Sequence, residues 1–198
     1  RFADKATSSY RPGYSFSIPP TKLIHVDIDP FEIGKNYPAE VGISGDARAV
    51  LRDLLGVVAE QAPPRAWQAA PYTAEIEAEV ASWLDSFRAL AEAGQSPPTM
   101  GRVIADVRRV LPQNGLVFTS AGNIQAQVFQ EMAFSLPRTY ISAGGFSTMG
   151  WSYPAALGAK LARPDTPVVA LVGDGDFLMN VQELATAVQY DIPVVAVV

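Results

Sequence analysis

The sequence contains no cysteine and only one histidine, His25, among its 198 residues. The lack of cysteine excludes disulfides and thiolate metal sites, and a single histidine excludes a histidine-rich metal site and disfavours a Ser-His-Asp triad. No apolar run reaches the roughly 18 residues that a membrane span requires, and we expect no signal peptide. We therefore expect a cytoplasmic protein with no membrane partner.

Positive charge is also sparse. The 15 Lys and Arg residues are scattered along the chain and are outnumbered by 20 Asp and Glu, which gives a net charge of −5. A basic patch is the usual signature of a nucleic-acid surface, so the sequence predicts no nucleic-acid partner. Hydrophobic residues make up 48% of the chain, which is enough to build a sizeable core.

The first half of the chain contains a predicted strand and two predicted helices. Residues 23–28 (LIHVDI) are a short apolar run typical of a strand. Residues 47–61 carry apolar side chains at helical spacing, with Asp46 in the N-cap position, and a second apolar stripe predicts a helix over about residues 74–93. We divide the chain into a first domain (1–60), an interdomain connection with its own helix (61–98) and a second domain (99–198).

The second domain alternates strands with helices. We expect strands at residues 116–120, 139–142, 168–172 and 194–198, and helices at residues 99–111, 122–134, 150–162 and 181–190. Such alternation implies a parallel sheet covered by helices on both faces. The predicted fold class is therefore α/β.

An acidic residue between two glycines follows the apolar strand at residues 168–172. Gly173 and Gly175 would let the backbone approach a diphosphate closely, and Asp174 would supply a hard oxygen ligand for Mg²⁺. Open α/β sheets bind ligands at the carboxyl ends of their strands. The alternative is an ordinary Asp-Gly turn, because both residues are common in turns.

The wider pattern around this turn resembles a known family. The segment GDGDF followed by NVQELATA, with GGFSTMGWSYPAALGA upstream, is similar to the diphosphate-binding domain of thiamine diphosphate (ThDP) enzymes. Within that superfamily it most resembles the acetolactate synthase group, which reads GLGTMGFGLPAAIGA and then GDGSF with QELATA. RFADKAT, KLIHVDIDPFEIGKN and GISGDARAVL resemble the central, Rossmann-like domain of the same enzymes.

The resemblance implies roles for residues of the ThDP site. Asp174 would bind Mg²⁺, and Gly173, Gly175 and Asp176 would wrap the diphosphate, although Asp176 stands where many relatives have serine and could instead cap the next helix. Ser147 and Thr148 would lie at the pyrimidine end. Met149 would be the apolar wedge that holds the cofactor bent, which is the catalytic role assigned here; plain core filling is the alternative.

A second stretch of the site departs from the family pattern. Gly122, Asn123 and Ile124 align with the Gly-Gln-His of a VGQHQMW segment in relatives, so the resemblance implies that Gly122 and Asn123 bind the cofactor. The missing histidine bears on the acetolactate synthase assignment more than on ThDP binding. The alternative to cofactor binding is that these residues only form the N-cap and first turn of a helix.

The first domain carries candidates for a nucleotide site. In relatives, the stretch from Asp27 through Asp29 to Asp46 flanks the adenosine half of FAD, and the residue matching Arg1 lies on the flavin side. Because Ala3 and Lys5 replace the family's Asp and Arg, three outcomes stay open: FAD, another nucleotide or an empty site.

The resemblance also implies an activity and partners. We expect a ThDP- and Mg²⁺-dependent transferase or lyase that makes or breaks C–C bonds beside the carbonyl of 2-keto acids, through ylide addition, decarboxylation and carboligation. The alternatives are a C–C lyase or hydrolase acting on a diketone, a sulfoacetaldehyde acetyltransferase, or a non-catalytic homologue. Family members are homodimers or homotetramers with the active site at the subunit interface. The activating glutamate and the second Mg²⁺ ligand are expected outside this sequence, which we interpret as part of a larger enzyme.

Overall fold

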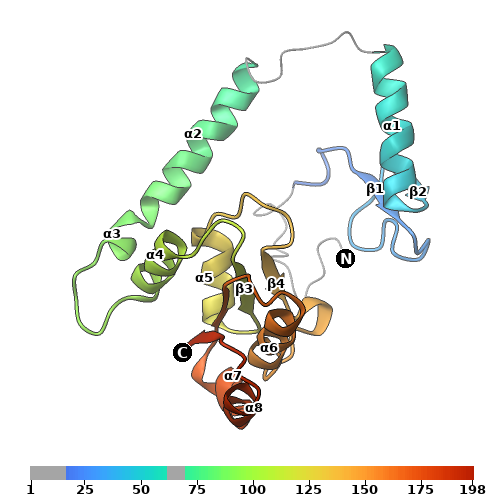
Figure 1. The fold of residues 1–198 in the computed structure, drawn as a ribbon. Helices are drawn as coiled ribbons and strands as arrows, with labels where there is room; N and C mark the ends of the chain where they lie inside the picture. The colour runs from blue at the N-terminus through green and yellow to red at the C-terminus, as the bar shows by residue number, and fades with distance from the viewer. Residues whose placement is uncertain (1–16, 62–69) are drawn as a thin grey trace. The chain divides into compact units, whose positions relative to one another are not determined.

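The structure is a computed structural model that describes residues 17–61 and 70–198. The chain divides into two compact units, Arg1–Ala69 and Ala70–Val198. Figure 1 draws both, with the undescribed residues as a grey trace. The predicted division into domains at residues 60 and 98 stays a prediction, and each unit is described separately below.

The first unit contains two parallel strands and one helix. Strand β1 (Ile24–Asp27) pairs with β2 (Val41–Ser44) in the register Ile24 to Val41, and α1 (Ala47–Gln61) follows. The predicted N-cap of α1 is confirmed, because the carboxylate of Asp46 accepts a hydrogen bond from the backbone N–H of Ala49 at 3.0 Å. Strand β2 was missed from the sequence, since its four residues include a glycine and a serine.

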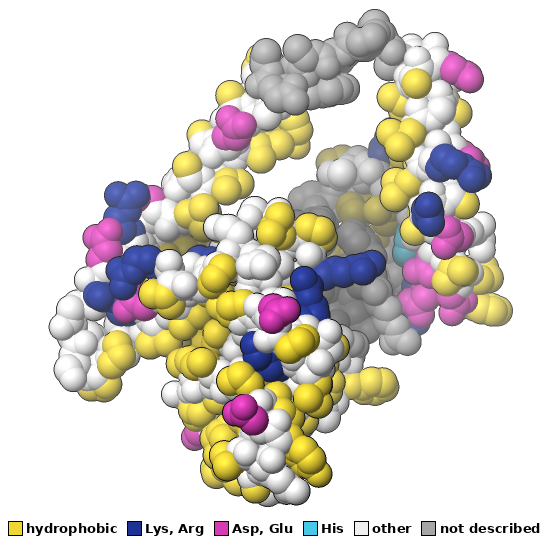
Figure 2. All heavy atoms as spheres, in the orientation of Figure 1, with side chains coloured by type: hydrophobic (Ala, Val, Ile, Leu, Met, Phe, Trp, Pro, Cys, Tyr) yellow, Lys and Arg dark blue, Asp and Glu magenta, His cyan; other side chains and the backbone are white. Residues whose placement is uncertain are grey.

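The helix predicted over residues 74–93 is divided in two in the structure. Helix α2 (Pro71–Ser86) starts three residues earlier, with Pro71 in the first turn where its missing N–H costs nothing, and α3 (Arg88–Ala91) follows the break at Phe87. The Ser86 hydroxyl donates to the carbonyl of Trp83 at 2.6 Å, a bond that competes with helical pairing at this point. Figure 2 shows apolar side chains exposed along α2.

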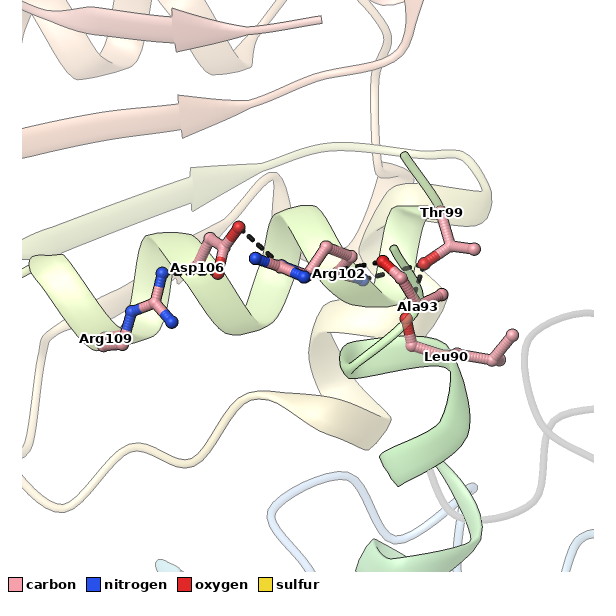
Figure 3. Close-up of polar contacts among 6 residues, drawn as sticks. All are labelled: Leu90, Ala93, Thr99, Arg102, Asp106 and Arg109. Atoms are coloured by element: carbon pink, nitrogen blue, oxygen red, sulfur yellow. Dashed lines mark hydrogen bonds and ion pairs between the residues drawn. The ribbon is translucent and has the colours of Figure 1, made fainter. Parts of the chain in front are cut away.

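Two residues fix the connection from α3 into α4 (Met100–Val110), as Figure 3 shows. Thr99 is the N-cap of α4: its hydroxyl oxygen accepts from the N–H of Arg102 at 3.1 Å and its hydroxyl donates to the carbonyl of Leu90 at 2.6 Å. The Arg102 guanidinium bonds the carboxylate of Asp106 at 2.8 Å and reaches the carbonyl of Ala93 at 3.5 Å. The loop that contains Pro97 and Pro98 is therefore anchored at both of its ends.

A four-stranded parallel sheet forms the centre of the second unit. Its strands are β3 (Leu116–Thr119), β4 (Tyr140–Ser142), β5 (Val168–Leu171) and β6 (Val195–Val197), in the spatial order β4-β3-β5-β6. All three pairings are parallel. Every residue of β3 and β5 is buried, as expected for central strands with both faces covered.

Helices cover both faces of this sheet, so the predicted fold class is confirmed (Figure 1). Helices α4 and α5 (Asn123–Glu131) pack on one face, where Val117, Val169 and Leu171 point. Helices α6 (Ser152–Ala162) and α8 (Glu183–Gln189) pack on the other, against Phe118 and Ala170. Two short elements complete the unit, the 3₁₀ turn Gly144–Phe146 and helix α7 (Asp174–Leu178). The alternation of side chains along each strand separates the two core clusters.

One charged group in this unit lies in an unfavourable environment. Oε1 of Glu131, at the end of α5, is buried and has no hydrogen-bond partner among the described residues. Burial raises the pKa of the Glu131 carboxyl above its ordinary value, because the charged form is poorly solvated. An acid whose folded pKa is raised contributes stability below its unfolded pKa and loses that contribution as the pH rises through the folded pKa.

Replacing this carboxyl by a neutral amide should therefore stabilise the fold at neutral pH. We predict that Glu131→Gln raises the midpoint of urea unfolding at pH 7 and has little effect near pH 3, where the wild-type carboxyl is protonated in both states. Glu92→Gln, at an exposed position, serves as the control and should change neither midpoint. An equal stabilisation at both pH values would show that the charge of Glu131 is not the cause.

Candidate active site

A cavity of about 720 Å³ opens at the carboxyl ends of β3, β5 and β6. It lies where the loops leaving parallel strands meet, which is the usual ligand position in open α/β sheets. Its volume falls within the range of small-molecule sites. The cavity brings together seven of the residues predicted from the sequence: Gly122, Asn123, Met149, Gly173, Asp174, Gly175 and Asp176.

Asp174 supplies an exposed carboxylate to this cavity. It is the first residue of α7 and follows the N-cap Gly173 in the loop that leaves β5. Its Oδ1 accepts the N–H of Gly175 at 2.8 Å. No Lys or Arg is among the described residues that line the cavity. An anionic ligand here would therefore need a cation held by Asp174 to offset its charge.

Met149 lies directly against the glycine turn. A Cβ built on Gly175 would come within 3.1 Å of Met149 Cε, so the absence of a side chain at Gly175 allows the methionine to lie there. Met149 keeps 44% of its surface exposed. A methionine that only filled the core would be buried, and this one presents an apolar surface to the cavity.

The cavity wall also includes Gly122, the N-cap of α5. Its φ of 141° and ψ of 177° place it in a region that favours glycine, and a Cβ there would meet no atom within 4 Å. No side chain of a described residue caps α5 by a hydrogen bond. The N–H groups of its first turn are therefore open to an acceptor, which suits a phosphate group.

Asp176 differs from Asp174 although only one residue separates them. It is 4% exposed, and its two carboxylate oxygens accept three hydrogen bonds: from the N–H of Gly150 at 2.5 Å, the hydroxyl of Ser120 at 2.5 Å and the hydroxyl of Ser152 at 2.8 Å. The N-caps of α7 and α8 are Gly173 and Gln182, so the capping role considered for Asp176 is not the one observed.

Two predicted residues do not line the cavity. Ser147 adopts a left-handed conformation with φ of 46°, and its hydroxyl donates to the side-chain oxygen of Gln125 at 3.2 Å. Thr148 is exposed next to it. The cavity wall thus receives Met149 but neither of the two residues before it.

Three candidates for a nucleotide site, Asp27, Asp29 and Asp46, lie in the first unit. Each carboxylate accepts a hydrogen bond from a backbone N–H two or three residues further along the chain. Asp27 Oδ1 accepts the N–H of Asp29 at 2.9 Å, and Asp29 Oδ1 accepts the N–H of Phe31 at 3.0 Å. Asp46 caps α1 as described above. Arg1 lies outside the described residues. Each of the three carboxylates therefore has a local structural role.

Part of the cavity wall was not predicted from the sequence. Pro97, Pro98, Met100 and Val103, from the loop before α4 and its first turn, line the cavity. The Pro-Pro pair was interpreted as part of an interdomain connection. No local chemical signal marks these residues, because they contribute apolar surface and no reactive group.

The described residues, 17–61 and 70–198, contain neither a candidate membrane helix nor a candidate metal cluster. No helix in these ranges is both long and apolar enough to span a bilayer. No group of three or more His, Asp or Glu side chains gathers there in a way that could hold a metal ion. Asp174 and the buried Asp176 are the acidic side chains among the described residues that line the cavity.

Comparison with protein families defines the class of this site. Residues 120–198 match the thiamine pyrophosphate enzyme C-terminal TPP-binding domain, and residues 1–54 match the thiamine pyrophosphate enzyme central domain. The first of these matches contains every predicted ThDP residue and the strands β4 to β6. The chain belongs to the thiamine pyrophosphate enzymes, and thiamine diphosphate is the cofactor of its class.

Individual relatives narrow the class to acetolactate synthase-like proteins. The chain is 38% identical over 208 residues to a probable acetolactate synthase large subunit of Methanocaldococcus jannaschii. The aligned region covers 98% of this chain and 32% of the relative. It is 36% identical to the acetolactate synthase large subunit of Haemophilus influenzae and 32% identical to isozyme 3 of Escherichia coli, covering all of this chain and 33% of each relative. The chain spans about a third of the length of these relatives.

Proposed function

We propose that the protein is a ThDP- and Mg²⁺-dependent enzyme of the acetolactate synthase-like group. It would make or break C–C bonds next to the carbonyl of 2-keto acids. The observation that carries this proposal is the single cavity that joins Asp174, Met149 and Gly122 in a segment matching the TPP-binding domain.

The residues present suit a diphosphate bound through Mg²⁺. A Cβ at Gly122 or Gly173 would meet no atom within 4 Å, so the two glycines leave open space beside their backbone. Asp174 offers the hard carboxylate oxygen that Mg²⁺ prefers, and the metal keeps further positions for phosphate oxygens and water. With no Lys or Arg along the described wall, Mg²⁺ is the natural counterion of the diphosphate.

Bound ThDP supplies a nucleophilic carbon and an electron sink for decarboxylation. The residues of this chain bind and orient it. Met149 lies on the Gly175 side of the cavity, where its apolar side chain can separate the two rings of a bent cofactor. Ile124, Val103 and Val172 give the cavity apolar walls that exclude water from the reacting carbon.

We propose the substrate class from the names of the relatives. Relatives called acetolactate synthase suggest a 2-keto acid such as pyruvate, joined after decarboxylation to a second carbonyl compound. A second candidate rests on Asn123 and Ile124, which line the cavity where the synthase pattern has Gln-His. An apolar Ile124 suits a C–C lyase or hydrolase acting on a diketone, or a sulfoacetaldehyde acetyltransferase.

A substrate panel separates these candidates. The intact protein that contains this sequence would be assayed with pyruvate, 2-ketobutyrate, a cyclic diketone and sulfoacetaldehyde, with and without ThDP and Mg²⁺. Acetolactate formed from pyruvate supports the leading proposal. Turnover of the diketone or of sulfoacetaldehyde alone would support the second candidate, and no ThDP-dependent turnover would favour a non-catalytic homologue.

Further features of the intact protein belong to the same proposal. We propose a cytoplasmic homodimer or homotetramer with its active site at the subunit interface, where a glutamate from outside this sequence activates the pyrimidine ring. A second Mg²⁺ ligand would likewise come from outside the sequence. Analytical ultracentrifugation of the intact protein tests the assembly: a monomer that is fully active would contradict it.

FAD binding in the first unit stays a prediction. The carboxylates of Asp27, Asp29 and Asp46 each accept a backbone hydrogen bond, and each keeps a further oxygen for a ribose hydroxyl. The absorbance spectrum of the purified intact protein tests the idea, since bound flavin is yellow and stays with the protein through gel filtration.

Removing the carboxylate of Asp174 should abolish metal-dependent cofactor binding. We predict that Asp174→Ala in the intact protein weakens ThDP binding in the presence of Mg²⁺ by about 10²-fold, because the diphosphate loses its counterion, and that activity falls with it. Isothermal titration calorimetry measures the affinity. Asp165→Ala is the matched control, because Asp165 is exposed and precedes β5 at the opposite end of the strand. Unchanged affinity in Asp174→Ala would refute the assignment.

Shortening Met149 should separate binding from turnover. We predict that Met149→Ala binds ThDP with an affinity within about threefold of the wild type, while kcat falls by about 10²-fold, because the cofactor is held but its reactive geometry is lost. Met179→Ala, at another exposed methionine, is the control. A loss confined to ThDP affinity, with kcat at saturation unchanged, would show that Met149 only contributes binding surface.

A further inference from the structure

The peptide group of Gly150, directly after Met149, is held on both of its sides. Its N–H donates to Oδ1 of Asp176 at 2.5 Å, and its carbonyl accepts from the side-chain amide of Asn180 at 2.5 Å. Asp176 and Asn180 lie four residues apart in the segment that begins at α7. One segment of the chain therefore fixes both polar groups of the Gly150 peptide.

The same segment is tied to two other elements. The second oxygen of Asp176 accepts the hydroxyl of Ser120, at the end of β3, and the hydroxyl of Ser152, the first residue of α6. Ser120 and Ser152 are fully buried. A carboxylate offers acceptor sites only, so it can satisfy three donors that a serine hydroxyl at this position could not.

The position of Gly150 requires a glycine, because the backbone conformation and the neighbouring atoms leave no space for a side chain. Its φ of +79° is one that residues with a side chain avoid, and a Cβ there would lie 2.7 Å from Asn180 Nδ2 and 3.1 Å from Met179 Cβ. The backbone of Met149 is consequently fixed by the residue that follows it. The Met149 side chain in turn lies against the position of Gly175, between Asp174 and Asp176 in the sequence.

We propose that Asp176 and Asn180 are positioning residues that hold Met149 against the cofactor, and that Asp176 binds neither the diphosphate nor the metal. The inference rests on the proposed ThDP function. The two neighbouring carboxylates then have different roles. Asp174 is exposed and binds the metal, whereas both carboxylate oxygens of Asp176 already accept hydrogen bonds from Ser120, Gly150 and Ser152.

The test uses Asp176→Asn and Asn180→Ala in the intact protein, with Asp165→Asn as the matched control. An amide in place of Asp176 keeps the size of the side chain but turns one acceptor into a donor, so at least one of the three bonds is lost. Three quantities are measured: the ThDP dissociation constant with Mg²⁺, kcat at saturating ThDP, and the rate at which the C2 proton of bound ThDP exchanges with deuterium.

We expect both variants to disturb the geometry of the bound cofactor without weakening ThDP binding. In both variants kcat and the exchange rate should fall together by about tenfold or more, while the dissociation constant stays within about threefold of the wild type. In a Met149→Ala background, Asp176→Asn should cause almost no further fall in the exchange rate, because both changes act on the same contact.

Three results would overturn the inference. They are an unchanged exchange rate in both variants, a full additional fall in the Met149→Ala background, or a loss of Mg²⁺-dependent ThDP affinity in Asp176→Asn that matches Asp174→Ala. Asn180→Ala removes a bond from a partly exposed side chain and keeps the test available if Asp176→Asn fails to fold. A wild-type protein that does not bind ThDP would instead refute the proposed function itself.

Discussion

The candidate site depends on one buried carboxylate that accepts three hydrogen bonds. Asp176 receives donors from Ser120 at the end of β3 and from Gly150 and Ser152 at the start of α6, so two segments far from it in the sequence meet at its side chain. Leaving any of these buried donors without a partner costs about 1–3 kcal/mol, which is enough to fix their relative positions. The cavity walls formed by Gly122 and Met149 are attached to these same segments.

The sheet and its helices were predictable because their signals are local. Apolar runs such as residues 168–172 coincide with strands, and helical spacing together with Asp46 gave the bounds of α1 correctly. The convergence of Asp174 and Met149 followed from their places after parallel strands. Strand β2 and the break at Phe87 were not predicted, since pairing partners and a single serine hydroxyl decide them.

The side-chain role of Asp176 could not be foreseen for a different reason. Its sequence position, two residues after Asp174, suggested the diphosphate, but the three donors that surround it come from residues 24 to 56 positions away. Pro97 and Pro98 were overlooked in the same way, because only the folded chain brings them to the cavity. A family resemblance identifies the motif, whereas tertiary contacts decide which carboxylate of the motif faces the ligand.

A crystal structure of the intact protein with ThDP and Mg²⁺ bound would test the proposed site most directly. We expect Mg²⁺ at about 2.1 Å from an oxygen of Asp174, the Met149 side chain between the two rings of the cofactor, and Asp176 still bonded to Gly150, Ser120 and Ser152. A cofactor bound outside this cavity, or an Asp176 carboxylate that has left its three donors to coordinate the metal, would contradict it.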